Sequence, residues 1–262
     1  MNKTISILGC GWLGLPTAIK LIENGYHVKG STTSPEKIAT FKNLNIEPYI
    51  ISIENLKDSN ISSFLTSQIL LIALPSKNIE GFKNLLKLIL TSTIKKVVFI
   101  SSTSVYTAKN KIVTETSILK PSALLEIENL FKTPKLKTTI VRFAGLFGYN
   151  RKPGNFFRNG RIIPNPNGFV NMIHQDDCVN ILFEIISKEI YNETFNACAD
   201  SHPNRTEYYT KVKKDIGVEP PVFEKTDSSP FKIVCNKKIK ETLNYTFKYP
   251  DLLKINYSAP FL

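Results

Sequence analysis

The alternation of short apolar runs with longer segments of helical period constrains the fold of this 262-residue chain most. In the segment 79–93, Phe82, Leu85 and Ile89 recur at the spacing of one buried helix face. Such alternation indicates a parallel sheet covered by helices on both faces. We predict strands at 5–8, 28–32, 49–53, 69–74, 97–101 and 139–142, with helices after Gly11, after Pro35, at 79–93 and at 122–132.

The first predicted strand runs into the motif Gly9-Cys10-Gly11-Trp12-Leu13-Gly14, which opens the first helix. In this context the first glycine permits a tight turn, the second admits a pyrophosphate, and the third allows close helix–strand packing. The sequence therefore predicts an α/β protein with a Rossmann-type, doubly wound parallel sheet that binds a nicotinamide dinucleotide. We assign these residues to the cofactor site: Gly9, Gly11, Trp12, Leu13, Gly14, Leu74, Pro75 and Ser101.

The end of the second predicted strand indicates which dinucleotide is preferred. An NAD-selective site places an acidic side chain there, to bind the ribose hydroxyls. This chain has Ser31, Thr32 and Thr33 instead, with no carboxylate before Glu36 and with Lys37 close behind. Hydroxyl and ammonium groups suit a 2′-phosphate, so we predict NADP, with NAD as the alternative.

The amino-acid composition of the chain changes after the sixth predicted strand. The segment 145–168 is rich in Gly, Pro, Asn and Arg, and it predicts a long irregular loop. Beyond it we predict a helix at 176–188, a strand at 194–197 and a helix at 206–216. We therefore expect a dinucleotide-binding domain at 1–148 and a small α/β substrate lobe at 149–262, some of whose segments can return to the sheet.

Arginine is unevenly distributed. Only five arginines occur, at 142, 151, 158, 161 and 205, and three of them fall within the predicted loop. Because the guanidinium fork suits carboxylates and phosphates, this cluster indicates an anionic ligand, with Arg151 as our substrate-binding candidate. A merely basic surface loop is the alternative.

Charge and cysteine content exclude several classes of protein. The net charge of +12 comes from lysines scattered over the chain, without an aromatic-interleaved basic stripe, so we expect no nucleic-acid partner. Cysteines 10, 178, 198 and 235 are too widely spaced for a metal site and predict reduced thiols. No apolar run is long enough to span a membrane, although residues 1–10 admit a signal segment as a weaker alternative. We expect a cytoplasmic monomer or homodimer that binds a small molecule and no metal.

Three further motifs resemble those of the extended short-chain dehydrogenase/reductases, the NAD-dependent epimerase/dehydratase family. They are Ile100-Ser101-Ser102-Thr103-Ser104-Val105-Tyr106, Arg142-Phe143-Ala144-Gly145-Leu146-Phe147-Gly148 and Val170-Asn171-Met172-Ile173-His174-Gln175-Asp176-Asp177. Within that family the chain is most similar to the YeeZ-like group, through Gly11-Trp12-Leu13-Gly14-Leu15-Pro16, Pro153-Gly154, Phe156-Phe157, Phe195-Asn196 and His202-Pro203. The resemblance covers nearly the whole chain.

The resemblance implies a Tyr-x-x-x-Lys pair that moves the substrate's proton, and this pair is missing. At its expected place the spacing puts Lys120 and Leu124. Across the chain, Tyr209 with Lys213 alone has the right spacing, and we interpret that pair as an aromatic packed inward beside a lysine in solvent.

The resemblance places Ser102 at the family's substrate-orienting serine. We take Ser102 and Tyr106 as catalytic candidates, Tyr106 being supported by nearby Lys109, although a packed tyrosine with a satisfied hydroxyl is the alternative. Thr103 and His174 join Arg151 as substrate-binding candidates, yet a histidine that caps a helix is the stronger interpretation of His174.

Two functions remain open from the sequence. One is an NADP(H)-binding oxidoreductase or epimerase with non-standard acid/base residues, acting on a small anionic or sugar-like substrate. The other is a catalytically silent dinucleotide-binding sensor or scaffold.

Overall fold

The computed structural model describes residues 3–56, 60–107, 110–225 and 230–259, and the chain forms two compact units. The first unit contains Met1–Ser101, Lys120–Arg142 and Val179–Thr194, and the second contains Ser102–Leu119, Phe143–Cys178 and Phe195–Leu262. The sequence predicted a boundary at 148, with some later segments able to return to the sheet. The chain passes between the units several times, and the segment 179–194 returns to the first unit.

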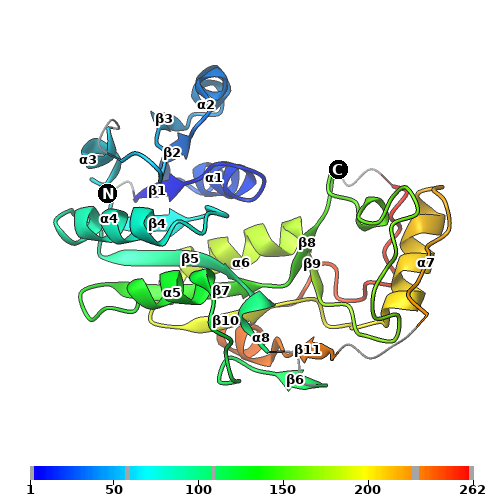
Figure 1. Ribbon diagram of the computed structural model, residues 1–262. Helices are drawn as coiled ribbons and strands as arrows, with labels where there is room; N and C mark the ends of the chain where they lie inside the picture. The colour runs from blue at the N-terminus through cyan, green and yellow to red at the C-terminus, as the bar shows by residue number, and fades with distance from the viewer. Residues whose placement is uncertain (1–2, 57–59, 108–109, 226–229, 260–262) are drawn as a thin grey trace. The chain divides into compact units, whose positions relative to one another are not determined.

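A seven-stranded sheet is the centre of the fold (Figure 1). Its spatial order is β10-β7-β5-β4-β1-β2-β3, and the pairs from β3 to β5 are parallel. The order reverses between β1 and β4, which is where ligands bind in sheets of this kind. The strands are β1 (Thr4–Leu8), β2 (His27–Thr32), β3 (Glu47–Ile50), β4 (Ile69–Ile72), β5 (Lys96–Ser102), β7 (Lys137–Phe143) and β10 (Thr194–Ala197).

One face of the sheet carries the first core. Phe82 and Leu85 of α4 are fully buried there, and the rings of Phe99 and Phe131 stack with centroids 5.4 Å apart. The predicted helix face is thus the one that is buried. The helices that begin in or cross the first unit are α1 (Gly14–Glu23), the 3₁₀ turn η1 (Pro35–Lys37), α2 (Ile38–Asn43), α3 (Ile61–Phe64), α4 (Ile79–Leu90), α5 (Ala123–Leu130) and α6 (Gln175–Ser187).

The second unit has its own core, in which Phe147, Tyr208 and Tyr257 are completely buried. Two small parallel sheets belong to it, β6 (Lys111–Val113) with β11 (Lys232–Val234) and β8 (Gly145–Phe147) with β9 (Met172–His174). Its helical elements are η2 (Thr103–Val105), η3 (Pro153–Asn155), α7 (Arg205–Asp215) and α8 (Lys237–Leu243). Within the described ranges, no helix is both long and apolar enough to cross a membrane.

The predicted strands and the longer helices are present. The predicted strand at 194–197 is β10, which lies beside β7 in the seven-stranded sheet and is thus one of the later segments that return to it. The predicted irregular loop also contains β8 and η3, and the three-residue strands β6, β9 and β11 were not predicted. Segments this short carry too few residues for a periodic pattern to show.

Candidate functional site

The glycine loop between β1 and α1 has the geometry that its sequence predicts. Gly9 has φ +99°, and a Cβ there would lie 2.8 Å from Leu74 Cδ2 and 3.0 Å from the carbonyl oxygen of Ala73. A Cβ on Gly14 would collide with the backbone of Gly9, whereas one on Gly11 would meet nothing within 4 Å. Gly9 and Gly14 are therefore required by the fold, and Gly11 faces open space.

The loop is anchored to the end of β2. The backbone N–H of Cys10 donates to the carbonyl of Ser31 at 2.8 Å, and the N–H of Gly9 donates to Ser31 Oγ at 2.9 Å. Cys10 points into the core, where burial raises the pKa of its thiol to about 12. The loop is thus held in place before any ligand binds, and Cys10 is a buried neutral thiol.

Of the three hydroxyls predicted to bind a 2′-phosphate, two are used inside the fold. Ser31 is buried and accepts the Gly9 hydrogen bond, and Thr32 is buried with its Oγ1 accepting from the N–H of Ser34. Thr33 is exposed, as is Lys37 in the following turn η1. The exposed polar side chains after β2 are therefore Thr33, Glu36 and Lys37.

The remaining cofactor candidates differ in exposure. Trp12 and Leu74 are partly buried, Leu13 is buried, and Pro75 is exposed. Leu74 touches the space beside Gly9, so it shapes the loop.

Ser101 has a structural partner. Its hydroxyl donates to the carboxylate of Glu128, which also forms a bidentate ion pair with Arg142 at 3.1 and 2.7 Å. All three side chains are buried, and the arginine and serine compensate the desolvated carboxylate. Ser101 and Arg142 thereby tie β5 and β7 to α5.

The catalytic candidates lie at the end of β5, where Ser102 is its last residue, and just after it. Ser102 Oγ accepts from the N–H of Ser104 and caps η2. Thr103 is buried in that turn, and Tyr106 is only 1% exposed, with its hydroxyl donating to Asn196 Oδ1 at 2.7 Å. This geometry favours the packed, satisfied tyrosine over a tyrosine that moves a substrate's proton. Lys109, its proposed neighbour, lies outside the described residues.

Helix α5 has no acid/base pair. Lys120 precedes it and is exposed, and Leu124 packs against the first core. The other Tyr-x-x-x-Lys pair, on α7, is structural. Tyr209 is buried as predicted, but the prediction of a solvated Lys213 was wrong, because that side chain is buried and pairs with Glu219 at 3.1 Å.

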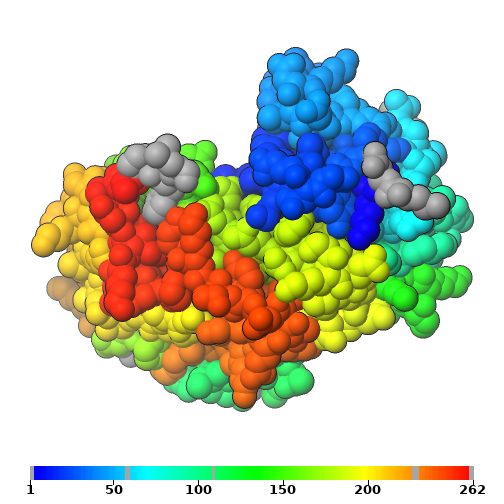
Figure 2. All heavy atoms as spheres, turned by 180° about the vertical axis from the view of Figure 1, so that it is seen from behind, coloured from blue at the N-terminus to red at the C-terminus, as the bar shows by residue number. Residues whose placement is uncertain are grey.

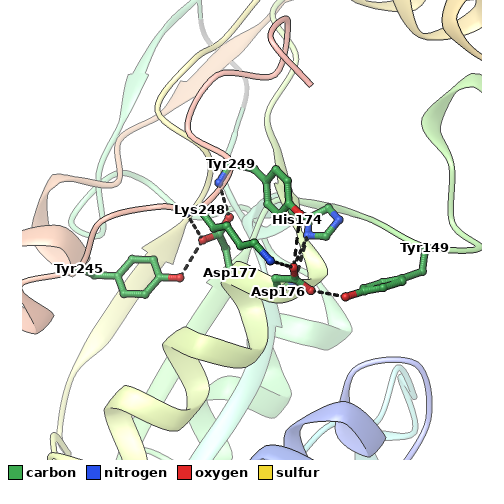
Figure 3. A network of polar contacts seen from close by, with 7 residues as sticks. All are labelled: Tyr149, His174, Asp176, Asp177, Tyr245, Lys248 and Tyr249. Carbon is green, nitrogen blue, oxygen red and sulfur yellow. Dashed lines mark hydrogen bonds and ion pairs between the residues drawn. The ribbon is translucent and has the colours of Figure 1, made fainter. Parts of the chain in front are cut away.

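A polar network in the second unit surrounds the start of α6 (Figure 3). Asp177 is fully buried and accepts from the Tyr245 hydroxyl at 2.8 Å and from the N–H groups of Lys248 and Tyr249 at 2.7 and 3.1 Å. Burial raises the pKa of Asp177, although these hydrogen bonds oppose the shift. Asp177 thus holds the C-terminal segment that follows α8, which lies on the surface in orange and red in Figure 2.

Asp176 is the second carboxylate of the network. It accepts from the Tyr149 hydroxyl at 2.7 Å and pairs with Lys248 Nζ at 2.7 Å. Burial opposes its ionisation, but the hydrogen bonds from Lys248 and Tyr149 outweigh that effect and lower the pKa of Asp176. Burial and Asp176 together raise the pKa of Tyr149 to about 12, so the tyrosine stays protonated as a donor.

His174 is buried among aromatic rings at the end of β9. Its Nδ1 accepts from the N–H of Asp176 at 3.1 Å, and its ring centroid lies 4.0 Å from that of Tyr249 and 5.2 Å from that of Phe147. Burial lowers the pKa of His174 to about 4 despite the neighbouring Asp176. A neutral imidazole that accepts a hydrogen bond at a helix start fits the capping role, the stronger of the two interpretations from the sequence.

Arg151 is exposed in a tight turn, where it exchanges two backbone hydrogen bonds with Gly148. Tyr149, Tyr245, Lys248 and Tyr249 were not singled out from the sequence. The only local signal was the pair Asp176–Asp177, whose partners lie up to 73 residues away. In the described part of the chain, no group of three or more His, Cys, Asp or Glu side chains is placed to hold a metal.

Comparison with known proteins shows which of them share this architecture. No family model matches the chain. The fold is similar to that of a candidate NAD-dependent epimerase/dehydratase from Methylobacillus flagellatus, with a TM-score of 0.81 at 22% identity, covering 99% of this chain and 98% of that one. It is also similar to a Bacillus cereus UDP-glucuronic acid 4-epimerase in complex with NAD, with a TM-score of 0.79 at 18% identity, covering 98% and 97%.

The strand order and the glycine loop thus define the fold as that of the extended short-chain dehydrogenase/reductases. The sequence is 30% identical to protein YeeZ of Escherichia coli over 269 aligned positions, which cover 96% of this chain and 98% of YeeZ. The chain belongs to the YeeZ family.

Proposed function

We propose that this protein binds NADP(H) at the glycine loop and belongs functionally to the dinucleotide-dependent oxidoreductases and epimerases, with a small-molecule substrate and without their usual acid/base pair. The observation that carries the proposal is the loop itself. Gly11 is exposed and has free space where a Cβ would be, and α1 begins at Gly14 without a side-chain cap. Backbone N–H groups at such a helix start favour a pyrophosphate.

The preference for NADP is supported by the chemistry after β2. Thr33 and Lys37 are exposed there, and Glu36 is the first carboxylate to follow the strand. An ammonium and a hydroxyl favour the extra phosphate of NADP, whereas NAD selectivity calls for a carboxylate at the strand end.

We expect this protein to differ from the active oxidoreductases and epimerases in its rate of substrate turnover. Positioned acid/base groups contribute roughly 10²- to 10⁴-fold in rate. Because α5 has no tyrosine–lysine pair and Tyr106 is buried against Asn196, we expect binding without rapid hydride transfer. A redox-sensing or scaffolding role is the second candidate, favoured by this same absence.

Trp12 provides a direct test of the binding site, because the single tryptophan of the chain lies in the glycine loop. Titration of NADPH is expected to change its fluorescence. Gly11→Ala adds a methyl group that contacts no protein atom, so the apo protein should keep its melting temperature while NADPH affinity falls about tenfold or more. Unchanged affinity in Gly11→Ala would show that the loop does not bind the dinucleotide.

A further inference from the structure

Three arginines of the second unit have no acidic partner among the described residues. Arg142 pairs with Glu128, and Arg151 is tied into its turn, but Arg158, Arg161 and Arg205 form no ion pair and no side-chain hydrogen bond with the described part of the chain. Arg158 and Arg161 are exposed, so water can satisfy their donors, whereas Arg205 is half-buried and its Nε has no acceptor in the described residues.

Two of these arginines converge on one aromatic ring. The guanidinium carbon of Arg161 lies 5.8 Å from the ring centroid of Phe157, and that of Arg205 lies 5.9 Å from the same centroid. Arg205 also lies 5.7 Å from the ring of Tyr209, and the rings of Phe157 and Tyr209 meet edge to face at 5.0 Å. These cation–π contacts hold the guanidinium groups beside the rings without using up their N–H donors, which can bind another group.

The position of Arg205 is not explained by helix stability. It is the first residue of α7, where a positive charge opposes the helix dipole, whereas Lys213 and Lys214 occupy the favourable last turn. Its Nε is buried without an acceptor in the described residues. A cation held at this end, with one donor desolvated, would be stabilised by an anion.

The backbone N–H groups at the start of α7 already have hydrogen-bond acceptors. The N–H groups of Arg205 and Thr206 donate to the carbonyls of Gly168 and Pro166, and the N–H of Glu207 donates to Asn204 Oδ1. Any anion at this place must therefore be bound by the guanidinium groups and not by the backbone.

We propose that Arg161 and Arg205, oriented by Phe157 and Tyr209, form a site in the second unit for an oxyanion group, a phosphate or a carboxylate. That this group belongs to the substrate rests on the proposed function, but anion binding itself does not. The proposal adds Arg161 and Arg205 to Arg151, the substrate-binding candidate that the sequence favoured within the same loop.

Calorimetric titration of inorganic pyrophosphate and of succinate tests the site and separates phosphate from carboxylate ligands. The titrations use the Gly11→Ala background, so that the glycine loop does not contribute phosphate binding. Arg205→Gln and Arg161→Gln are each expected to lower the affinity of the preferred anion about tenfold or more. Phe157→Leu, which keeps every charge, should weaken it as well because the arginines lose their orientation.

Arg158→Gln is the matched control, because this substitution removes the same charge from an exposed residue of the same loop. Among the described residues, Arg158 forms no cation–π contact with Phe157 or Tyr209. Arg158→Gln should change the affinity less than about twofold. An equal loss in Arg158→Gln would show general attraction by the net charge of +12 and overturn the site. Failure of wild-type and Gly11→Ala proteins to bind either anion would also overturn it, whatever the result with NADPH.

Discussion

His174 shows how burial decides the role of a titratable residue. Its ordinary pKa is near neutrality, where it could carry protons, but burial among Phe147, Tyr149 and Tyr249 lowers the pKa to about 4. Folding therefore requires the neutral imidazole. Between pH 6.5 and 4 the unfolded chain binds a proton at this residue that the folded protein does not bind, so stability must fall as the pH falls through that range.

We predict that His174→Asn removes this dependence, because the amide oxygen can accept the Asp176 hydrogen bond without titrating. Urea unfolding at pH 7 and pH 4.5 should show a larger loss of stability in the wild type, by about 2 kcal/mol. His202, whose pKa burial also lowers, and Asp177, whose pKa burial raises, remain in both proteins and cancel in the difference. A parallel loss of stability in the two proteins would contradict the assignment.

At the scale of elements, the end of β2 and the turn η1 carry the groups on which our proposed NADP preference rests. Ser31 and Thr32 are buried at the strand end, and Ser31 holds the glycine loop, so the polar side chains exposed there are Thr33, Glu36 and Lys37. We therefore propose that this short turn, and not the sheet, sets the dinucleotide preference.

We predict that wild-type protein binds NADPH more tightly than NADH, and that Lys37→Ala lowers NADPH affinity about fivefold while NADH affinity stays the same. Lys42→Ala, which removes the same charge from the exposed side of α2, is the control. Trp12 fluorescence measures both cofactors. Equal or tighter binding of NADH by the wild type would contradict NADP selectivity.

At the scale of the whole molecule, the chain keeps the fold of a dehydrogenase but not its proton-transfer pair. Glu128 and Arg142 are engaged with each other, Tyr106 with Asn196, and Lys213 with Glu219. These polar groups thus stabilise the fold.

We predict that purified protein binds NADPH yet oxidises or reduces no common alcohol, ketone or nucleotide sugar at a rate above background, and that Tyr209→Phe changes neither property. Tyr106→Phe should lower the free energy of unfolding by about 1–2 kcal/mol, because Asn196 Oδ1 loses its buried donor. NADPH absorbance at steady state measures turnover. Turnover that Tyr106→Phe or Ser102→Ala abolishes, in variants that remain folded, would instead identify a relocated acid.

The sequence by itself determined the sheet, the glycine loop and the family, because these depend on local information. Side-chain periodicity specifies strands and helices, and the roles of Gly9, Gly11 and Gly14 follow from backbone geometry within one turn. The histidine that caps α6 was also predictable, since its acceptor and donor are two residues apart.

Only the tertiary structure decided which polar groups are free to act. Whether Ser31, Tyr106 or Lys213 faces a ligand depends on hydrogen-bond partners 22, 90 and 6 residues away. In each case the side chain forms a hydrogen bond with that partner inside the fold. The arrangement of Arg161 and Arg205 around Phe157 likewise depends on η3 packing against α7. Periodicity records whether a side chain is buried, but the desolvation and hydrogen bonding that set its chemistry come from residues that folding brings together.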